Sequence, residues 1–271
     1  MLPHVLAKED VVDFNRLLEN KRVFINGGQR GIGKDIALLF AGQGAIIALG
    51  GRREEVLENT MKEIKALSPL SKGYLLDVSK GEDLEAVCQE ILTDFEGIDI
   101  IVNTVGVNKH IYTHDLTDED LDRMLETNYK STIRSARKFL PGMMERKWGT
   151  IVNISSIHSV QTMPGYTCYA GTKGAMNAAA RSMALEYAPY NIRVNNLAPG
   201  LIYSDNMMDE INAFQGEEQE AFLKLLEGMQ PLPPGSMANV SHAALFLASD
   251  LSSYITGQTL LVDGGATIKA H

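Results

Sequence analysis

Tyr169 and Lys173 have residue types and a spacing that suit proton transfer. Tyr169 is the only one of nine tyrosines with a lysine four residues later. On a helix this spacing places both side chains on one face. A phenol releases its proton near pH ~10, and a neighbouring ammonium lowers that pKa toward neutral pH. The pair therefore predicts an acid–base site, although the same spacing also occurs in surface pairs.

The run from Gly149 to Ser156 is rich in β-branched residues and ends in two serines, Ser155 and Ser156. In a parallel sheet, ligands bind beyond the carboxyl ends of the strands. We expect Ser156 to hydrogen-bond a carbonyl or alcohol oxygen there, whereas Ser155 also suits a loop cap. The thirteen residues from Ser156 to Tyr169 allow the chain to return to the same edge.

A glycine-rich turn, Asn26 to Gly33, lies between an expected strand and an expected helix. Glycines permit a tight turn, close approach of the backbone to a pyrophosphate, and close packing of helix on strand. Amides at the helix N-terminus favour an anion. The spacing is G-x-x-x-G-x-G rather than the common G-x-G-x-x-G, and such a turn also occurs for shape alone. Its position predicts a dinucleotide site.

Arginines at two places favour NADP(H) as the dinucleotide. A site selective for NAD usually ends its second strand with an acidic residue that binds the ribose hydroxyl. Here Gly51 stands in that place, followed by Arg52 and Arg53, and Arg30 lies inside the glycine-rich turn. A guanidinium pairs with a 2′-phosphate. The alternative is that Arg52 and Arg53 are a solvated helix start.

These residues need a scaffold, and short β-branched runs that alternate with amphipathic stretches provide one. Strands alternating with helices imply a parallel sheet covered on both faces. We therefore predict an α/β fold, a single-domain Rossmann-like doubly wound parallel sheet with flanking helices. The expected strands are Arg22–Asn26, Ala45–Leu49, Gly73–Asp77, Ile98–Asn103, Thr150–Ser155, Ile192–Leu197 and Thr259–Asp263. The expected helices are Gly31–Ala41, Arg53–Leu67, Gly81–Phe95, Asp118–Glu145, Cys168–Ala188 and Val240–Ser249.

Two segments lie outside this alternation. Residues 1–20 suggest a short helical extension ahead of one cofactor-binding domain over residues 21–271. Residues 201–235 form a long insertion with several methionines. An insertion of this length is usually a lid or a binding loop, and methionines suit an adaptable apolar surface. Ordinary helix packing is the alternative.

Composition narrows the partners and the location. The net charge of −9 disfavours broad binding to nucleic acid or anionic lipid. No apolar stretch approaches the ~20 residues that span a bilayer, and the charged N-terminus does not suit a signal peptide. We expect a cytoplasmic protein with no nucleic-acid or membrane partner.

The cysteines and histidines do not predict a metal site. Cys88 and Cys168 lack metal-ligand spacing and are expected to be buried free thiols. His110 and His114 are four residues apart in an expected loop, without an evident third ligand.

Several ordered motifs together resemble the short-chain dehydrogenase/reductase family over nearly the whole chain, from Arg22 to Gly265. The resemblance implies that Ser156 polarises the substrate oxygen and that Tyr169 is the acid in reduction and the base in oxidation. It also implies that Lys173 binds the nicotinamide ribose and that Asn128 anchors a water. The motifs are Gly27-x-x-x-Gly31-Ile32-Gly33, Asp77-Val78, Asn103-Thr-Val-Gly106, Asn128, Ser156, Tyr169-x-x-x-Lys173, Pro199-Gly200 and Val262-Asp263-Gly264-Gly265.

The same resemblance implies an extended cofactor site and a homotetramer, or a homodimer, built through the helices that contain Asn128 and Tyr169. Asp77 and Val78 are expected at the adenine, and Ile202 and Ser204 at the nicotinamide amide. The full expected cofactor set is Gly27, Gln29, Arg30, Gly31, Ile32, Gly33, Arg52, Arg53, Asp77, Val78, Asn103, Gly106, Tyr169, Lys173, Pro199, Gly200, Ile202 and Ser204.

Three positions depart from the family pattern. Asn26 replaces the usual Thr, and we expect its side chain to make a similar turn hydrogen bond. Thr104 replaces the second Asn of an Asn-Asn-Ala-Gly motif, which puts the sheet-stabilising role of that Asn in doubt. Ser204 stands where Thr is frequent, and its hydroxyl suits the same role.

The expected substrate surroundings are largely apolar: His158, Met163, Tyr166, Tyr203, residues 107–110 and the segment from Tyr203 to Met229. They favour a bulky hydrophobic alcohol or ketone such as a hydroxysteroid or bile acid. Short stretches also resemble bacterial hydroxysteroid dehydrogenases.

The sequence supports three other functions to different degrees. A 3-oxoacyl-carrier-protein reductase would need a basic entrance, and the sequence offers only Arg134, Arg137 and Lys138 as a cluster. A sugar or polyol dehydrogenase is another alternative. A non-catalytic NADP(H)-sensing module is disfavoured, because Ser156, Tyr169 and Lys173 are all present.

Overall fold

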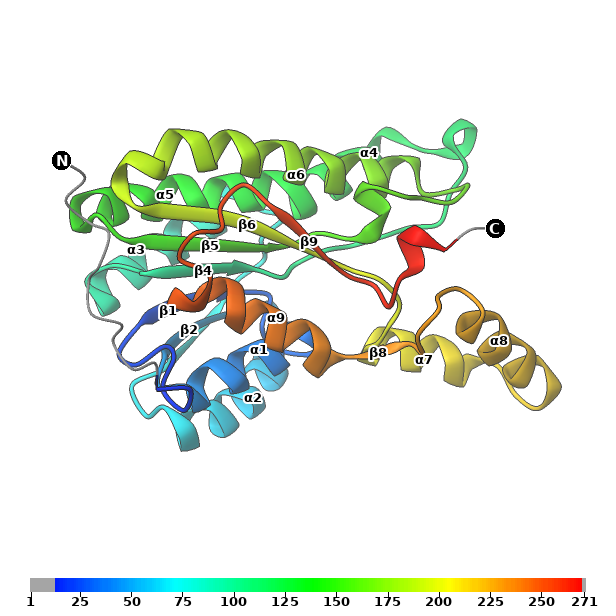
Figure 1. The fold of residues 1–271 in the computed structure, drawn as a ribbon, viewed down its shortest axis with the longest axis horizontal. Helices are drawn as coiled ribbons and strands as arrows, with labels where there is room; N and C mark the ends of the chain where they lie inside the picture. Colours follow the sequence, from blue (N-terminus) through cyan, green and yellow to red (C-terminus); the bar gives the residue numbers. More distant parts are fainter. Residues whose placement is uncertain (1–12, 270–271) are drawn as a thin grey trace.

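The computed structural model describes residues 13–269, and within them seven strands form one parallel sheet (Figure 1). Its order is β3-β2-β1-β4-β5-β6-β9, and every neighbouring pair is parallel. The order reverses between β1 and β4, where doubly wound sheets open a crevice for ligands. The predicted fold is confirmed. The strands are β1 (Arg22–Asn26), β2 (Ile46–Gly51), β3 (Lys72–Leu75), β4 (Ile100–Asn103), β5 (Gly149–Ile154), β6 (Ile192–Pro199) and β9 (Thr259–Val262).

Helices cover both faces of the sheet (Figure 1). One buried core joins α1 (Gly31–Gly42), α2 (Glu54–Leu67) and α9 (Met237–Ala248) to the sheet. A second core on the opposite face joins α3 (Gly81–Phe95), α5 (Ser131–Arg146) and α6 (Thr167–Tyr187). Successive strand residues alternate between the two cores, as Phe24 and Ile25 do. The central strands read as continuous apolar runs because neither face meets water.

The single long helix expected from Asp118 to Glu145 is three pieces. Helix α4 (Asp118–Met124) leads into a π-helical turn (Leu125–Lys130), and α5 follows. A π turn carries an extra residue, and such turns often occur at functional sites. It contains Asn128, and the apolar periodicity of the sequence does not reveal it.

The expected helical extension over residues 1–20 is wrong for the part that the structure describes, and residues 1–12 lie outside the described range. Residues 13–20 form turns. The Asp13 side chain accepts a hydrogen bond from the Asn15 amide, and Asn20 has a φ of +59°. Asp and Asn favour such local turns over helix. The amides of Leu18 and Asn20 then donate to the carbonyls of Gln43 and Gly44, which ties the segment to the end of α1.

Residues 201–235 contain a pair of helices at one end of the molecule (Figure 1). Strand β7 (Ile202–Tyr203) pairs with β8 (Gly235–Ser236) and closes the base of the segment. Between them lie α7 (Asp205–Ala213) and α8 (Glu217–Glu227). The two helices are joined by Phe214, directly after α7, and Phe222 of α8, whose ring centres are 4.9 Å apart. Both helices are largely exposed.

Candidate active site

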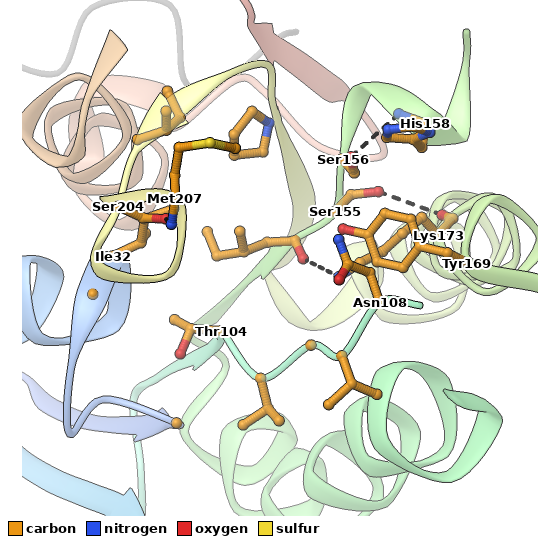
Figure 2. Close-up of a pocket in the computed structure, with 18 of the residues that line it drawn as sticks. Ile32, Thr104, Asn108, Ser155, Ser156, His158, Tyr169, Lys173, Ser204 and Met207 are labelled. Atoms are coloured by element: carbon orange, nitrogen blue, oxygen red, sulfur yellow. Dashed lines mark hydrogen bonds between the residues drawn. The ribbon is translucent and has the colours of Figure 1, made fainter. Parts of the chain in front are cut away.

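A cleft of about 1480 Å³ opens at the carboxyl ends of the strands. It is lined by the glycine-rich turn, by residues that follow β4, β5 and β6, by α6 and by the segment 201–235. Pockets for small-molecule ligands measure roughly 300–1,000 Å³, so this cleft has room for a dinucleotide and part of a substrate. In Figure 2, Ser156, Tyr169 and Lys173 lie on one side of it, and Ile32, Ser204 and Met207 lie on the other.

Lys173 is held inside the protein directly behind Tyr169. Only 2% of the lysine is exposed, and its Nζ donates a 2.8 Å hydrogen bond to the Ile154 carbonyl at the end of β5. The same Nζ lies 5.7 Å from the centre of the Tyr169 ring. Burial lowers the pKa of Lys173 to about 8. A Cβ on Gly106 would lie 3.3 Å from Nζ, so the missing side chain there leaves room for the ammonium.

Ser156 reaches Tyr169 from the end of β5. Burial raises the pKa of Tyr169, and a hydrogen bond between the Ser156 and Tyr169 side chains offsets part of that rise. Ser156 Oγ also accepts a 3.2 Å hydrogen bond from the His158 amide, which caps a short 3₁₀ turn (Figure 2). The structure therefore brings the expected serine, tyrosine and lysine together on one wall.

Asn128 lies behind this wall and does not line the cleft. Its Nδ2 donates to the Val107 carbonyl at 2.9 Å and to Thr172 Oγ1 at 3.0 Å, and its Oδ1 accepts from the Val107 amide at 2.8 Å. These bonds join the π turn, the loop after β4 and helix α6. The role of Asn128 as a water anchor stays a prediction.

Close packing shapes the glycine-rich turn, and its Gly27 and Gly28 amides donate to the Gly50 carbonyl. Gly27 has a φ of +89°, and a Cβ there would lie 2.4 Å from Val105 Cγ2. A Cβ on Gly33 would lie 2.5 Å from the Gly27 carbonyl, so only glycine allows α1 to begin so close to β1. The Gly31 amide, two residues before Gly33, donates a 2.9 Å hydrogen bond to Asp205 Oδ2 of α7. A carboxylate thus lies at the N-terminus of α1, where an anion such as a pyrophosphate is favoured.

The expected turn hydrogen bond from the Asn26 side chain is wrong. Both side-chain polar atoms of Asn26 are buried and have no partner among the described residues. Thr104 makes the connection instead, because its Oγ1 and its amide both donate to the Asn26 carbonyl, at 2.7 and 3.0 Å. The hydroxyl at position 104 therefore links β1 to the loop after β4.

Arginines line the other end of the cleft. Arg30, Arg52 and Arg53 are exposed there. A Cβ on Gly51 would lie 2.4 Å from Gln29 Oε1, which accepts a hydrogen bond from the Arg53 amide. The Gln29 side chain thus occupies the space that an acidic residue at position 51 would need.

Asp77 provides the acidic group beside these arginines. Burial opposes its ionisation, but hydrogen bonds from Ser79 and the charge of Arg52 hold the pKa of Asp77 below its ordinary value. Asp77 therefore places a negative charge near Arg52 at this end of the cleft.

A cluster of aromatic rings packs beside Tyr169. The rings of His158 and Tyr166 are 4.6 Å apart, those of His110 and Tyr166 are 5.2 Å apart, and those of His158 and Tyr169 are 5.5 Å apart. Burial lowers the pKa of His158. Its Nδ1 contacts Thr162 Oγ1 at 2.8 Å. Met163 lines the same part of the cleft.

Most of the residues expected at the site line the cleft, and three described ones do not. Asn103 is buried beneath it in the sheet, Asn128 lies behind Lys173, and Tyr203 lies in β7 beside Ser236. Sequence reasoning missed Asp205 and Asn177. Asn177 follows Lys173 by four residues on α6, and that spacing was the signal that could have marked it.

The remaining expectations concern cysteines, metals and membranes. Cys88 and Cys168 are buried and free, as predicted. In the described part of the chain, no group of three or more His, Cys, Asp or Glu side chains gathers as a metal would require. Between residues 13 and 269, no helix combines the length and apolar character that crossing a membrane needs.

Comparisons with known proteins agree with this geometry. A family model described as enoyl-(acyl carrier protein) reductase matches residues 27–267. The 3-oxoacyl-[acyl-carrier-protein] reductase FabG of Chlamydia muridarum is 34% identical, over 93% of this chain and 99% of the relative. A glucose 1-dehydrogenase of Gluconobacter oxydans is 33% identical, over 92% of each chain.

A solved structure adds a bound example. A 7α-hydroxysteroid dehydrogenase complexed with NADH and 7-oxo-glycochenodeoxycholic acid superposes with a TM-score of 0.85 at 28% identity, over 94% of this chain and 98% of that chain. The match of the family model, the relatives and the shared fold lead to one conclusion: this chain belongs to the short-chain dehydrogenase/reductase family, whose members are oxidoreductases that use nicotinamide cofactors.

Proposed function

We propose that this enzyme interconverts a secondary alcohol and its ketone with NADP(H), on a bulky hydrophobic substrate such as a hydroxysteroid or bile acid. One observation carries the proposal. Ser156, Tyr169 and the buried Lys173 form one wall of a cleft whose opposite end carries the glycine-rich turn and arginines.

When bound, the nicotinamide supplies or accepts the hydride. In reduction, Tyr169 donates its phenolic proton to the carbonyl oxygen, and in oxidation the phenolate takes the proton from the alcohol. Ser156 holds that oxygen beside the phenol. Lys173 binds the ribose, and its ammonium, 5.7 Å from the centre of the Tyr169 ring, is a nearby positive charge of the kind that favours a phenolate. Asn128 fixes the loop after β4 and helix α6 around this lysine.

The choice of NADP(H) rests on the arginine end. Arg52 and Arg53 are exposed in the cleft, and Gln29 fills the space at Gly51 where an acidic residue would favour NAD. A guanidinium there attracts a 2′-phosphate. The cofactor-contacting residues in this proposal include Asp77 and Val78 at the adenine and Ile202 and Ser204 at the nicotinamide amide.

The choice of a hydrophobic substrate rests on the lining near Tyr169. Apolar side chains from several segments line the same cleft: Val107, Met163, Leu201, Met207, Leu225 and Met229. The adaptable methionines suit a large, rigid and apolar molecule. The 7-oxo bile acid bound to the hydroxysteroid dehydrogenase is such a molecule. In this proposal the segment 201–235 is a lid over the substrate.

Reduction of 3-oxoacyl carrier proteins is the second candidate, and the FabG relatives favour it. The cluster that would meet an acidic carrier is partly neutralised, because Arg134 pairs with Glu126 and Arg137 with Glu85. A sugar dehydrogenase is favoured by the glucose 1-dehydrogenase relative but not by the apolar lining. The family also suggests a homotetramer or homodimer, and a cytoplasmic location, as predictions.

A substrate panel tests the proposal. The purified enzyme is offered a 7-oxo bile acid, a 3-oxoacyl thioester and glucose, each with the NADP and the NAD form of the cofactor, while cofactor absorbance is followed. We expect the fastest turnover with the bile acid and NADPH. Faster turnover of the thioester or glucose would replace the proposed substrate. NADPH binding without turnover of any alcohol or ketone in a broader panel would favour a sensing module.

A further inference from the structure

A line of buried side chains crosses the middle of the sheet below the cleft. Asn103, Asn153 and Asn196 lie at the same register position on β4, β5 and β6. Asn103 Nδ2 donates to Asn153 Oδ1 at 2.8 Å, and Asn153 Nδ2 donates to Asn196 Oδ1 at 2.9 Å. Ser135 of α5 begins the line by donating to Asn103 Oδ1 at 2.9 Å. All four side chains are almost fully buried.

Asn177 of α6 extends this line to the loop that carries Ser156. Its Oδ1 accepts from Asn196 Nδ2 at 3.2 Å and from Ser155 Oγ at 2.9 Å. Its Nδ2 donates to Ser159 Oγ at 2.8 Å, and Ser159 Oγ donates to the Ser156 carbonyl at 2.6 Å. One amide therefore contacts the serine before Ser156 and, through Ser159, the backbone of Ser156 itself.

Helix geometry places this tether beside the acid–base pair. Tyr169, Lys173 and Asn177 are spaced by four residues and share one face of α6. We propose that Asn177 is a positioning residue for the reaction, which holds the 155–159 loop so that the Ser156 hydroxyl stays at the Tyr169 phenol. This inference rests on the proposed function, in which Ser156 holds the substrate oxygen.

The hydrogen bonds explain why an apolar residue cannot replace this amide. With Leu at position 177, the Ser155 hydroxyl would lose its shortest acceptor, and the Ser159 hydroxyl would lose the donor that fixes its orientation. Buried polar groups without partners are costly, so the loop would shift to find new ones. A shift of about 1 Å at a reacting group can lower the rate a hundredfold.

Asn195 of β6, next to the Asn196 that Asn177 contacts, provides a matched control. It is buried like Asn177 and makes two side-chain hydrogen bonds, donating to the Ile255 carbonyl at 2.8 Å and accepting from the Gln258 amide at 3.0 Å. Both partners lie in the loop before β9 and not at the Ser156 loop. Loss of this amide removes similar bonds from the opposite face of β6.

The experiment compares Asn177→Leu and Asn195→Leu in the full-length enzyme, with Ser156→Ala as the reference. We expect both Leu variants to lower Tm, but only Asn177→Leu to lower kcat, by about ten- to a hundredfold, with the Kd for NADPH unchanged. The pH profile of alcohol oxidation should also move. Because the hydrogen bond from Ser156 lowers the pKa of Tyr169, its loss shifts the rising limb to higher pH.

Two further variants protect the test. If Asn177→Leu does not fold, Ser159→Ala removes only the last link, and we expect it to lower kcat several-fold with the same shift of the pH profile. If Asn177→Leu folds, the double variant that combines Asn177→Leu with Ser159→Ala should lose no more kcat than Asn177→Leu alone. The inference would be overturned if Asn177→Leu kept the wild-type kcat and pH profile. If Asn177→Leu is not obtained, the same result in Ser159→Ala would overturn it. A fully active Ser156→Ala would instead overturn the proposed function.

Discussion

The two ends of the cleft are built in opposite ways. At the Tyr169 end, internal hydrogen bonds fix a buried lysine and the 155–159 loop beside the partly buried phenol. At the Arg52 end, exposed arginines and the glycine-rich turn line the cleft. Burial sets the direction of the pKa changes at the first end, where it lowers the pKa of Lys173 to about 8 and raises that of Tyr169. At the Arg52 end, burial of Asp77 is outweighed by hydrogen bonds and by the charge of Arg52, which together lower the pKa of Asp77.

This difference suggests that the Tyr169 end sets the rate of proton transfer and the Arg52 end sets the affinity for the cofactor. Low dielectric strengthens electrostatic interactions, so one buried ammonium can act strongly on one phenol. Exposed charges are screened by salt, and they act by attracting and sorting anions. Changes at the Tyr169 end should therefore alter turnover, and changes at the Arg52 end should alter cofactor affinity.

Tyr169→Phe should have the largest effect, because it removes the phenol that is hydrogen-bonded to Ser156 at this wall. We expect kcat to fall about a hundredfold or more, as for the loss of a general acid. The Kd for NADPH, measured by fluorescence titration, should stay near its wild-type value. Substantial residual turnover would show that another group donates the proton. Equal losses in turnover and in NADPH affinity would remove the separation between the two ends.

Arg52→Asp should have the next largest effect, on affinity instead of rate. It replaces a guanidinium with a carboxylate that repels a 2′-phosphate, so NADPH should bind roughly ten- to a hundredfold more weakly while NADH changes little. Lys65→Asp is the control, because it makes the same change of charge on α2 at an exposed position outside the cleft lining. Equal weakening of NADPH and NADH would show that Arg52 is not at the phosphate.

The sequence predicted the Tyr169 end better than its supports. Tyr169 and Lys173 were predictable because one helical spacing places them together, and the sheet followed from alternating apolar runs. The partners of Asn177 lie 18 to 22 residues away in the chain, on β6 or beyond β5, and only the strand register brings them together. The π turn at Asn128 was missed because one extra residue barely disturbs an amphipathic pattern.

The Arg52 end shows the same limit. The glycine spacing predicted an anion site, but the carboxylate now at the Gly31 amide comes from Asp205, which is 174 residues away. The Asn26 side chain was expected to bond within its own turn, yet the bond found at Asn26 is to its carbonyl, from the hydroxyl of Thr104 in the loop after β4. Local sequence predicts which groups can bind, and tertiary packing decides which of them do.

Asp205→Asn should have a smaller effect, and it tests whether the lid competes with the cofactor. The Asp205 carboxylate accepts a hydrogen bond from the Gly31 amide, where a pyrophosphate would also bind. Removing its charge should tighten NADPH binding by about two- to fivefold. Asp209→Asn, at an exposed position of the same helix, is the control. Weaker NADPH binding in Asp205→Asn would show that this carboxylate supports the cofactor instead of displacing it.

Replacing either cysteine with alanine should have the smallest effect on activity, although Cys168 lies next to Tyr169 in the chain. Cys88 is completely buried in α3, and burial raises the pKa of its thiol to about 12, so it stays protonated and unreactive. Burial also raises the pKa of Cys168. We expect kcat to change less than about twofold in both variants, and Cys88→Ala to lower Tm by a few degrees through the cavity it leaves. A large loss of kcat in Cys168→Ala with Tm unchanged would mean that the Tyr169 end extends to the adjacent position on α6. The buried wall would then include a sulfur, and the contrast between the two ends would have to be redrawn around it.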